Sequence, residues 1–205
     1  MTAYIFDLGG VLIKLNVHRC LQAFEALMGE QNVRAVLGMD RNGEGVQSVS
    51  IATKQLMADF ERGNISTEAF IEGVLAYCHP GVTKEQVVEA WMSMLDELPA
   101  ERLAFVDSLR AAGHSVYLLS NGNDLHFNWI NAIYRLDAHF DHLFLSQRMH
   151  LAKPESAIYK AADEAINGFG NTGKKIFIDD IEINRKAAER HVGWQTFSGI
   201  SELQQ

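Results

Sequence analysis

The chain has 205 residues, of which 47% are hydrophobic and 21% charged, and this balance is typical of a globular protein with a sizeable core. Its formal net charge of −8 argues against a general surface for nucleic acid or an anionic membrane, so we expect neither as a partner. The two cysteines lack metal-ligand spacing, and no secretion signal or membrane-spanning apolar run is recognisable. We therefore expect a cytoplasmic protein, and its oligomeric state cannot be predicted from the sequence.

The first expected element is an apolar strand that ends on a carboxylate. Residues 4–6 are apolar, Asp7 follows, and Gly9 and Gly10 precede a second apolar run. An aspartate at the carboxyl end of a buried parallel strand lies where open α/β sheets bind ligands. Glycines there let the backbone turn and approach the ligand. The alternative is a strand that ends in a capping aspartate and an ordinary glycine turn.

Residues 14–97 are dominated by helical periodicity. One helix starts near Val17 and stops at Gly29, and a short helix is expected at 33–37. A glycine-rich loop is expected at 38–45, and further helices at 51–60, after the N-cap Ser66, and after a capping box at residues 83–86. These features predict an all-helical insert with its own core. Its candidates for reaching Asp7 are Lys14, His18 and residues 41–44.

The rest of the chain alternates helices with strands. Strands are expected at 115–119, 142–145, 175–178 and 194–197, and the last residues are expected to fray. Such alternation predicts an α/β fold, with a Rossmann-like parallel sheet core and helices on both faces. We expect a core domain of residues 1–13 and 98–205, with residues 14–97 inserted as a helical cap after the first strand.

Polar side chains follow several of the expected strands, and right-handed crossovers would bring them to one edge of the sheet. They are Asp7, Ser120 with Asn121, Lys153, and Asp179 with Asp180. Three carboxylates at one edge repel unless a cation joins them, and oxygen ligands favour Mg²⁺. A lysine, a hydroxyl and an amide can hold phosphoryl oxygens, so the aspartate can attack phosphorus. Helix caps, a solvated lysine and turn aspartates are the alternatives.

Four ordered segments resemble the motifs of the haloacid dehalogenase-like (HAD) hydrolases. They are Phe6-Asp7-Leu8-Gly9-Gly10-Val11-Leu12, Leu119-Ser120-Asn121, Lys153-Pro154, and Ile178-Asp179-Asp180 with Asn184. The run from Leu119 to His126, together with Asp7-Leu8-Gly9, looks most like the bacterial α-D-glucose-1-phosphate phosphatase branch, which has a small helical cap.

That resemblance implies a role for each matching residue. Asp7 is the expected nucleophile, and Asp7, Asp180 and the Gly9 carbonyl are the expected Mg²⁺ ligands. Ser120 and Lys153 are expected to bind the phosphoryl group and to act with Asp7 in catalysis. Asp179 is expected to support the metal or Lys153.

Gly9 is a departure from the family pattern, which usually has a second aspartate there as general acid and base. General acid–base catalysis contributes roughly a hundred- to ten-thousand-fold. Another group could replace it, with His126, Asn123 or a cap carboxylate as candidates on the substrate side. Alternatively, the leaving group needs little protonation, as an anomeric sugar hydroxyl or an acyl group would, or the protein binds phosphate without turning it over.

We therefore expect a Mg²⁺-dependent phosphatase of a small phosphorylated metabolite, preferably a sugar phosphate, that works through an aspartyl-phosphate on Asp7. Two alternatives stay open. One is a metal-independent haloacid dehalogenase. The other is a catalytically weak HAD-like protein that binds a metabolite or a protein partner.

Overall fold

The computed structural model describes residues 1–37 and 51–203, apart from the side chains of residues 51–54. Its centre is one parallel five-stranded sheet with the strand order β3-β2-β1-β4-β5. The strands are β1 (Ala3–Phe6), β2 (Ser115–Ser120), β3 (His142–Leu145), β4 (Lys175–Ile178) and β5 (Gln195–Phe197). The expected α/β class with a parallel sheet is confirmed, and each strand lies within one residue of its predicted position.

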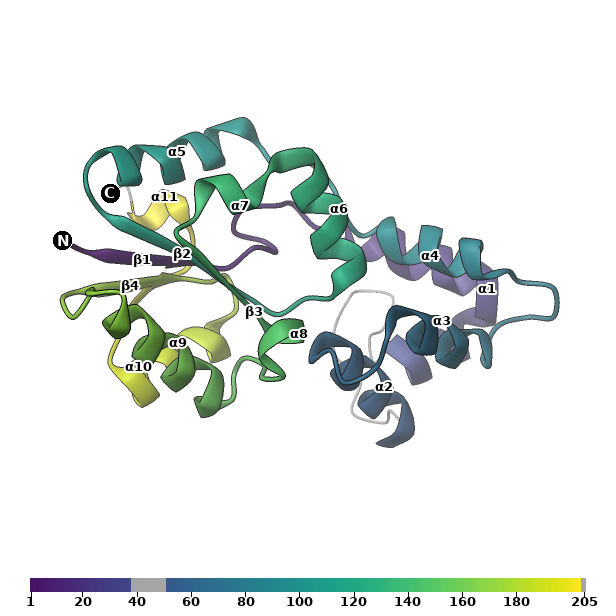
Figure 1. Ribbon diagram of the computed structural model, residues 1–205. Helices are drawn as coiled ribbons and strands as arrows, with labels where there is room; N and C mark the ends of the chain where they lie inside the picture. Colours follow the sequence, from purple (N-terminus) through teal and green to yellow (C-terminus); the bar gives the residue numbers. More distant parts are fainter. Residues whose placement is uncertain (38–50, 204–205) are drawn as a thin grey trace.

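Helices cover both faces of the sheet (Figure 1). One face carries α5 (Ala100–Ala111), α6 (Asp124–Tyr134), α7 (Leu136–His139) and α11 (Ile200–Leu203). The other carries α9 (Ser156–Gly168) and α10 (Glu182–Val192), while α8 (Ser146–Met149) follows β3 directly. The four-residue helices α7, α8 and α11 were not predicted. The expected fraying is wrong for α11, because Glu202 accepts hydrogen bonds from the backbone and hydroxyl of Ser198 at 2.6 Å.

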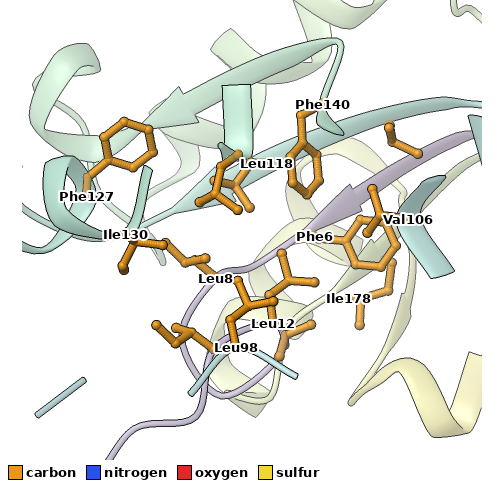
Figure 2. Packing of buried hydrophobic residues seen from close by; sticks show 14 of the residues in the cluster. Phe6, Leu8, Leu12, Leu98, Val106, Leu118, Phe127, Ile130, Phe140 and Ile178 are labelled. Atoms are coloured by element: carbon orange, nitrogen blue, oxygen red, sulfur yellow. The ribbon is translucent and has the colours of Figure 1, made fainter. Parts of the chain in front are cut away.

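The two faces of the sheet follow from the alternation of side chains along each strand. Phe6 of β1 packs on the α5 and α6 side, near Val106 of α5 and Phe140, as Figure 2 shows. Ile5 points to the opposite face and packs with Tyr159 of α9. Both faces are buried, so the strands read as continuous apolar runs rather than as alternating patterns.

The helices from residues 14–97 form a second hydrophobic cluster beyond the carboxyl ends of the strands (Figure 1). They are α1 (Val17–Leu37), α2 (Ile51–Glu61), α3 (Thr67–Leu75) and α4 (Lys84–Met92). Helix α1 is interrupted at Gly29, where the sequence predicted a stop, and the N-cap at Ser66 and the capping box are both present. The loop predicted at 38–45 and the candidates at 41–44 lie outside the described residues.

Two antiparallel connecting segments join this helical cluster to the rest of the chain. The Lys14 amide donates to the Glu97 carbonyl at 3.0 Å, and the Asp96 amide donates back to the Lys14 carbonyl at 3.0 Å. Next to these two hydrogen bonds, Leu15 and Leu95 form an isolated antiparallel β-bridge. This pairing lies at the two ends of residues 14–97, so it supports our division into core and cap, which we keep as a proposal. No helix of the described part of the chain is long and apolar enough to cross a membrane.

Candidate active site

The register of the sheet brings the ends of three strands together. Phe6 pairs with Leu118 on one side and with Ile178 on the other, so Asp7 emerges beside the last residues of β2 and the residue that follows β4. The Asp7 amide donates to the Ile178 carbonyl at 2.8 Å, which extends the pairing by one residue. The strand order reverses at β1, and open α/β sheets bind ligands at such a reversal.

Lys153 joins two of the carboxylates. Its Nζ lies 2.9 Å from Asp7 Oδ1 and 2.6 Å from Asp179 Oδ2, and all three side chains are buried. The alternative of a solvated lysine is therefore wrong. Burial works against the ammonium, but the two carboxylates outweigh it and raise the pKa of Lys153 above its ordinary value. The lysine therefore remains a fixed positive charge beside Asp7.

The two adjacent aspartates after β4 differ in what they contact. Asp179 accepts from Lys153, from the Asn184 amide group at 3.1 and 3.2 Å, and from the Ile181 backbone amide at 2.8 Å. Its carboxylate therefore orients Lys153. Asp180 is exposed, and Arg185 fixes the turn by donating to the carbonyls of both aspartates at 2.7 and 2.9 Å.

The three aspartates fit a hard divalent cation. One carboxylate oxygen each from Asp7, Asp179 and Asp180 lies within 4.8 Å of the others. Burial raises the pKa of Asp7 to about 6, with Lys153 opposing the rise and Asp179 adding to it. Although Asp180 is exposed as a whole residue, partial desolvation of its carboxyl group and the charge of Asp179 also raise its pKa. Three carboxylates facing one ammonium leave an excess of negative charge, which a cation with oxygen ligands such as Mg²⁺ would offset.

Gly10 is required by the approach of Asp180 to the turn after β1. Its φ is +74°, and a Cβ there would lie 2.2 Å from Asp180 Oδ2. The neighbouring Gly9 has no such backbone requirement. The space beside Gly9 is occupied by the cap-side residue Leu15, whose Cδ1 would lie 2.9 Å from a Cβ.

These groups open into a cavity of about 340 Å³ between the sheet edge and the cap helices. Asp7, Gly9, Ser120, Lys153 and Asp180 line it on the core side. The cap side is mainly apolar, with one carboxylate among its described residues: Leu15, Val17, Cys20, Leu21, Leu37, Met57, Glu61, Trp91, Met94 and Leu95. Lys14 and His18 are not among the lining residues, and Lys14 pairs with Glu97 instead.

Asn121 and Asn123 also line the cavity, but their side chains have structural partners. Asn121 donates to the Lys153 carbonyl at 2.9 Å and accepts from the Lys153 amide at 2.8 Å. This reciprocal pair positions the lysine backbone. Asn123 is the N-cap of α6, where its Oδ1 accepts from the His126 amide at 3.0 Å. Helix capping, which we considered for Ser120 and Asn121, therefore applies to Asn123. Ser120 keeps its hydroxyl at the cavity, 3.2 Å from the Asn121 carbonyl oxygen.

His126 is held against the cap. Its ring stacks on Trp91 at 5.2 Å with an interplanar angle of 12°, and its Nε2 lies 3.1 Å from the Trp91 carbonyl oxygen. Burial lowers the pKa of His126 to about 4. The imidazole is therefore neutral near pH 7, and one of its nitrogens is already engaged.

Two residues near the site were not found from the sequence. Arg102 of α5 donates to the carbonyls of Val11 and Leu12, at 2.7 and 3.3 Å, and so holds the segment that follows Asp7. Glu61, the last residue of α2, lines the cavity from the cap. Both act across large sequence separations, and neither lies in a recognisable local motif. No single-sequence signal could have found them.

A family model for the haloacid dehalogenase-like hydrolases matches residues 1–191. The chain belongs to this family. It is therefore a hydrolase of the HAD-like type, as the four segments predicted.

Individual relatives are similar over nearly the whole chain. A D-ribitol-5-phosphate phosphatase from Bacteroides thetaiotaomicron is 24% identical over 200 residues, which cover 94% of this chain and 89% of the relative. A HAD family enzyme from the same organism, solved in complex with magnesium and inorganic phosphate, is 31% identical with a TM-score of 0.78. That match covers 97% of this chain and 93% of the other. A predicted HAD-like family hydrolase from Porphyromonas gingivalis is 29% identical with a TM-score of 0.76, and the match covers 97% of this chain and 91% of the other.

Proposed function

We propose that this protein is a Mg²⁺-dependent phosphatase of a small phosphorylated metabolite, with a phosphorylated sugar or sugar alcohol as the favoured substrate. The observation that carries this proposal is the cluster of Asp7, Asp179 and Asp180 around Lys153. It combines a buried nucleophile with the ligands for a divalent cation and one positive charge for phosphoryl oxygens. The structure of the 31% identical relative with magnesium and phosphate supports the same assignment.

The proposed mechanism starts from the ionised Asp7 carboxylate, which attacks phosphorus and forms an aspartyl-phosphate. Asp7, Asp180 and the Gly9 carbonyl would hold Mg²⁺, which supplies charge neutralisation for the phosphoryl oxygens. Lys153 binds a phosphoryl oxygen as a point charge, and Ser120 donates its hydroxyl to another. Asn121 and Asp179 keep Lys153 in place through its backbone and its ammonium, respectively. Water then hydrolyses the intermediate.

The substrate class follows from the shape and lining of the cavity together with the relatives. A volume of about 340 Å³ suits a small metabolite rather than a phosphoprotein. The similar phosphatase named for D-ribitol 5-phosphate makes a sugar alcohol phosphate a direct candidate beside the sugar phosphates. An anomeric sugar phosphate stays in the proposal because its leaving group needs little protonation, so it would be cleaved without an acid at Gly9.

We also propose that the protein is located in the cytoplasm, which fits its two free cysteines.

A dehalogenase is less well supported. L-2-haloacid dehalogenase structures share the fold, with TM-scores near 0.58 and identities of 17% and 19%, but at this identity they indicate the fold alone. A dehalogenase attacks carbon and needs no metal. The excess of negative charge around Lys153 favours a site that takes up a cation.

The test is a screen of phosphorylated metabolites with Mg²⁺ and with a chelator. The panel includes D-ribitol 5-phosphate, glucose 6-phosphate and α-glucose 1-phosphate, with 2-haloacids as a separate arm. We expect phosphate release that depends on Mg²⁺ and disappears in Asp7→Asn. Release of halide in the presence of chelator would establish the dehalogenase instead. Metabolite binding without any turnover would establish the catalytically weak alternative.

A further inference from the structure

The missing side chain at Gly9 raises the question of which group handles the proton on the leaving oxygen. Outside the cluster of Asp7, Lys153 and the aspartates after β4, three titratable side chains line the cavity among the described residues: Cys20, Glu61 and His126. Burial raises the pKa of Cys20 to about 12, so its thiol does not exchange protons near pH 7. His126 is neutral and its Nε2 contacts the Trp91 carbonyl.

Glu61 lines the cavity, and three adjacent contacts between cap and core fix the backbone at Glu61 and the two residues after it. The Ser146 hydroxyl donates to the Glu61 carbonyl at 2.6 Å. The next residue, Arg62, forms an ion pair with Glu155. Gly63 then approaches the core so closely that a Cβ would lie 2.1 Å from the Gln147 carbonyl oxygen. The end of α2 is therefore fixed to α8, which lies between the sheet and α2 in Figure 1.

The position of Glu61 changes the acidity of its side chain. Burial raises the pKa of its carboxyl group above the ordinary value, although the neighbouring Arg62 acts in the opposite direction. A carboxyl with a raised pKa is protonated in a larger fraction of molecules near neutral pH, which is what a general acid needs.

We propose that Glu61 replaces the acid and base absent at Gly9, protonating the leaving oxygen from the cap side of the cavity. This inference deepens the proposed phosphatase function and depends on it. In the first step the Asp7 carboxylate forms a bond to phosphorus, the bond from phosphorus to the leaving oxygen breaks, and that oxygen takes the proton of the Glu61 carboxyl. The products are the aspartyl-phosphate, the free alcohol and the Glu61 carboxylate.

The second step restores the enzyme. The Glu61 carboxylate takes a proton from a water whose oxygen forms a bond to phosphorus. The bond between phosphorus and Asp7 breaks, so hydrogen phosphate leaves and both carboxyl groups return to their starting states. The same residue therefore serves both half-reactions.

Glu61→Gln tests this role because it keeps the size of the side chain and removes its proton transfer. Two substrates separate the half-reactions: D-ribitol 5-phosphate, whose leaving alcohol needs a proton, and 4-nitrophenyl phosphate, whose leaving group does not. We expect Glu61→Gln to lower turnover of the alkyl phosphate by about a hundred-fold or more. With the aryl phosphate we expect a burst of one equivalent of nitrophenol, followed by slow release of phosphate, because the intermediate accumulates.

The matched control is Glu89→Gln, which removes an exposed carboxylate of the cap helix α4 that does not line the cavity. We expect it to keep both activities within about threefold. The inference is overturned if Glu61→Gln retains the alkyl phosphatase rate, if both substrates slow equally without a burst, or if Glu89→Gln has the same effect. A wild-type protein without Mg²⁺-dependent phosphatase activity would overturn the proposed function itself, whereas an active wild type beside an active Glu61→Gln overturns only the role of Glu61.

Discussion

Replacing Asp7 by asparagine should abolish turnover and, in the absence of metal, make the protein more stable. The first effect follows from loss of the nucleophile. The second follows from the charges around Lys153. Asp7 is buried beside Asp179, and its pKa rises from 3.8 to about 6 even though Lys153 lies 2.9 Å away. The ionised carboxylate therefore destabilises the folded, metal-free protein, and asparagine cannot ionise.

The magnitude follows from that shift. One pKa unit corresponds to about 1.4 kcal/mol, so a shift of about two units corresponds to about 3 kcal/mol. The folded state binds this proton more tightly than the unfolded state does. The stability that the protonated Asp7 carboxyl contributes is therefore complete below about pH 4, is lost as the pH rises to about 6, and stays lost above that pH. In a chain of this length, about 3 kcal/mol corresponds to a rise in Tm of roughly 6 to 12 °C.

The assay is thermal unfolding followed by circular dichroism, in EDTA, for wild type and Asp7→Asn across this pH range. The control is Asp96→Asn, which removes an exposed carboxylate outside the cavity. We expect wild type and Asp7→Asn to have similar Tm values near pH 4, and the Tm of the variant to become the higher one as the pH rises. We expect added Mg²⁺ to stabilise the wild type more than the variant. An Asp7→Asn protein that is less stable than wild type in EDTA at pH 7.5 would refute this electrostatic reasoning.

Three further predictions follow from contacts at the site. Gly10→Ala should lower Mg²⁺ affinity at least tenfold by calorimetry, because its Cβ would displace Asp180, and unchanged affinity would contradict the tight contact. Asn121→Ala should lower kcat about tenfold through loss of both hydrogen bonds to the Lys153 backbone, whereas Asn121→Asp, which keeps only the acceptor, should retain more activity. The His126 ring should show no NMR titration between about pH 5.5 and 8, since its pKa is about 4, and a midpoint near 6.5 would show that its burial has been misjudged.

The parallel sheet could be predicted because each strand is a short apolar run bounded by polar or glycine residues. Residues 175–178, for example, end directly on Asp179, and the observed β4 has these bounds. The N-caps Ser66 and Thr83 could be predicted for a similar reason, because a helix cap is a local interaction within four residues. The short helices α7, α8 and α11 could not, since one turn of helix shows no periodicity.

The candidate site divides in the same way. The residues at the strand ends were found because strand direction alone brings Asp7 and Asp179 to one edge. What each side chain contacts there was not predictable. Asn121 was expected on a phosphoryl group, yet its amide is paired with the Lys153 backbone, 32 residues away in the chain. Glu61 reaches the cavity only because the cap folds back onto α8. Such contacts depend on tertiary packing, which a single sequence does not specify.

The central claim, a phosphatase that works through a covalent intermediate on Asp7, is tested most directly by trapping that intermediate. The protein is mixed with Mg²⁺ and a phosphorylated substrate that it turns over, quenched, and reduced with borohydride, which converts an aspartyl-phosphate to homoserine. Peptide mapping by mass spectrometry then locates the change. We predict homoserine at Asp7, dependent on both substrate and Mg²⁺. Phosphatase turnover with Asp7 unmodified, or with the change at another carboxylate, would contradict the account.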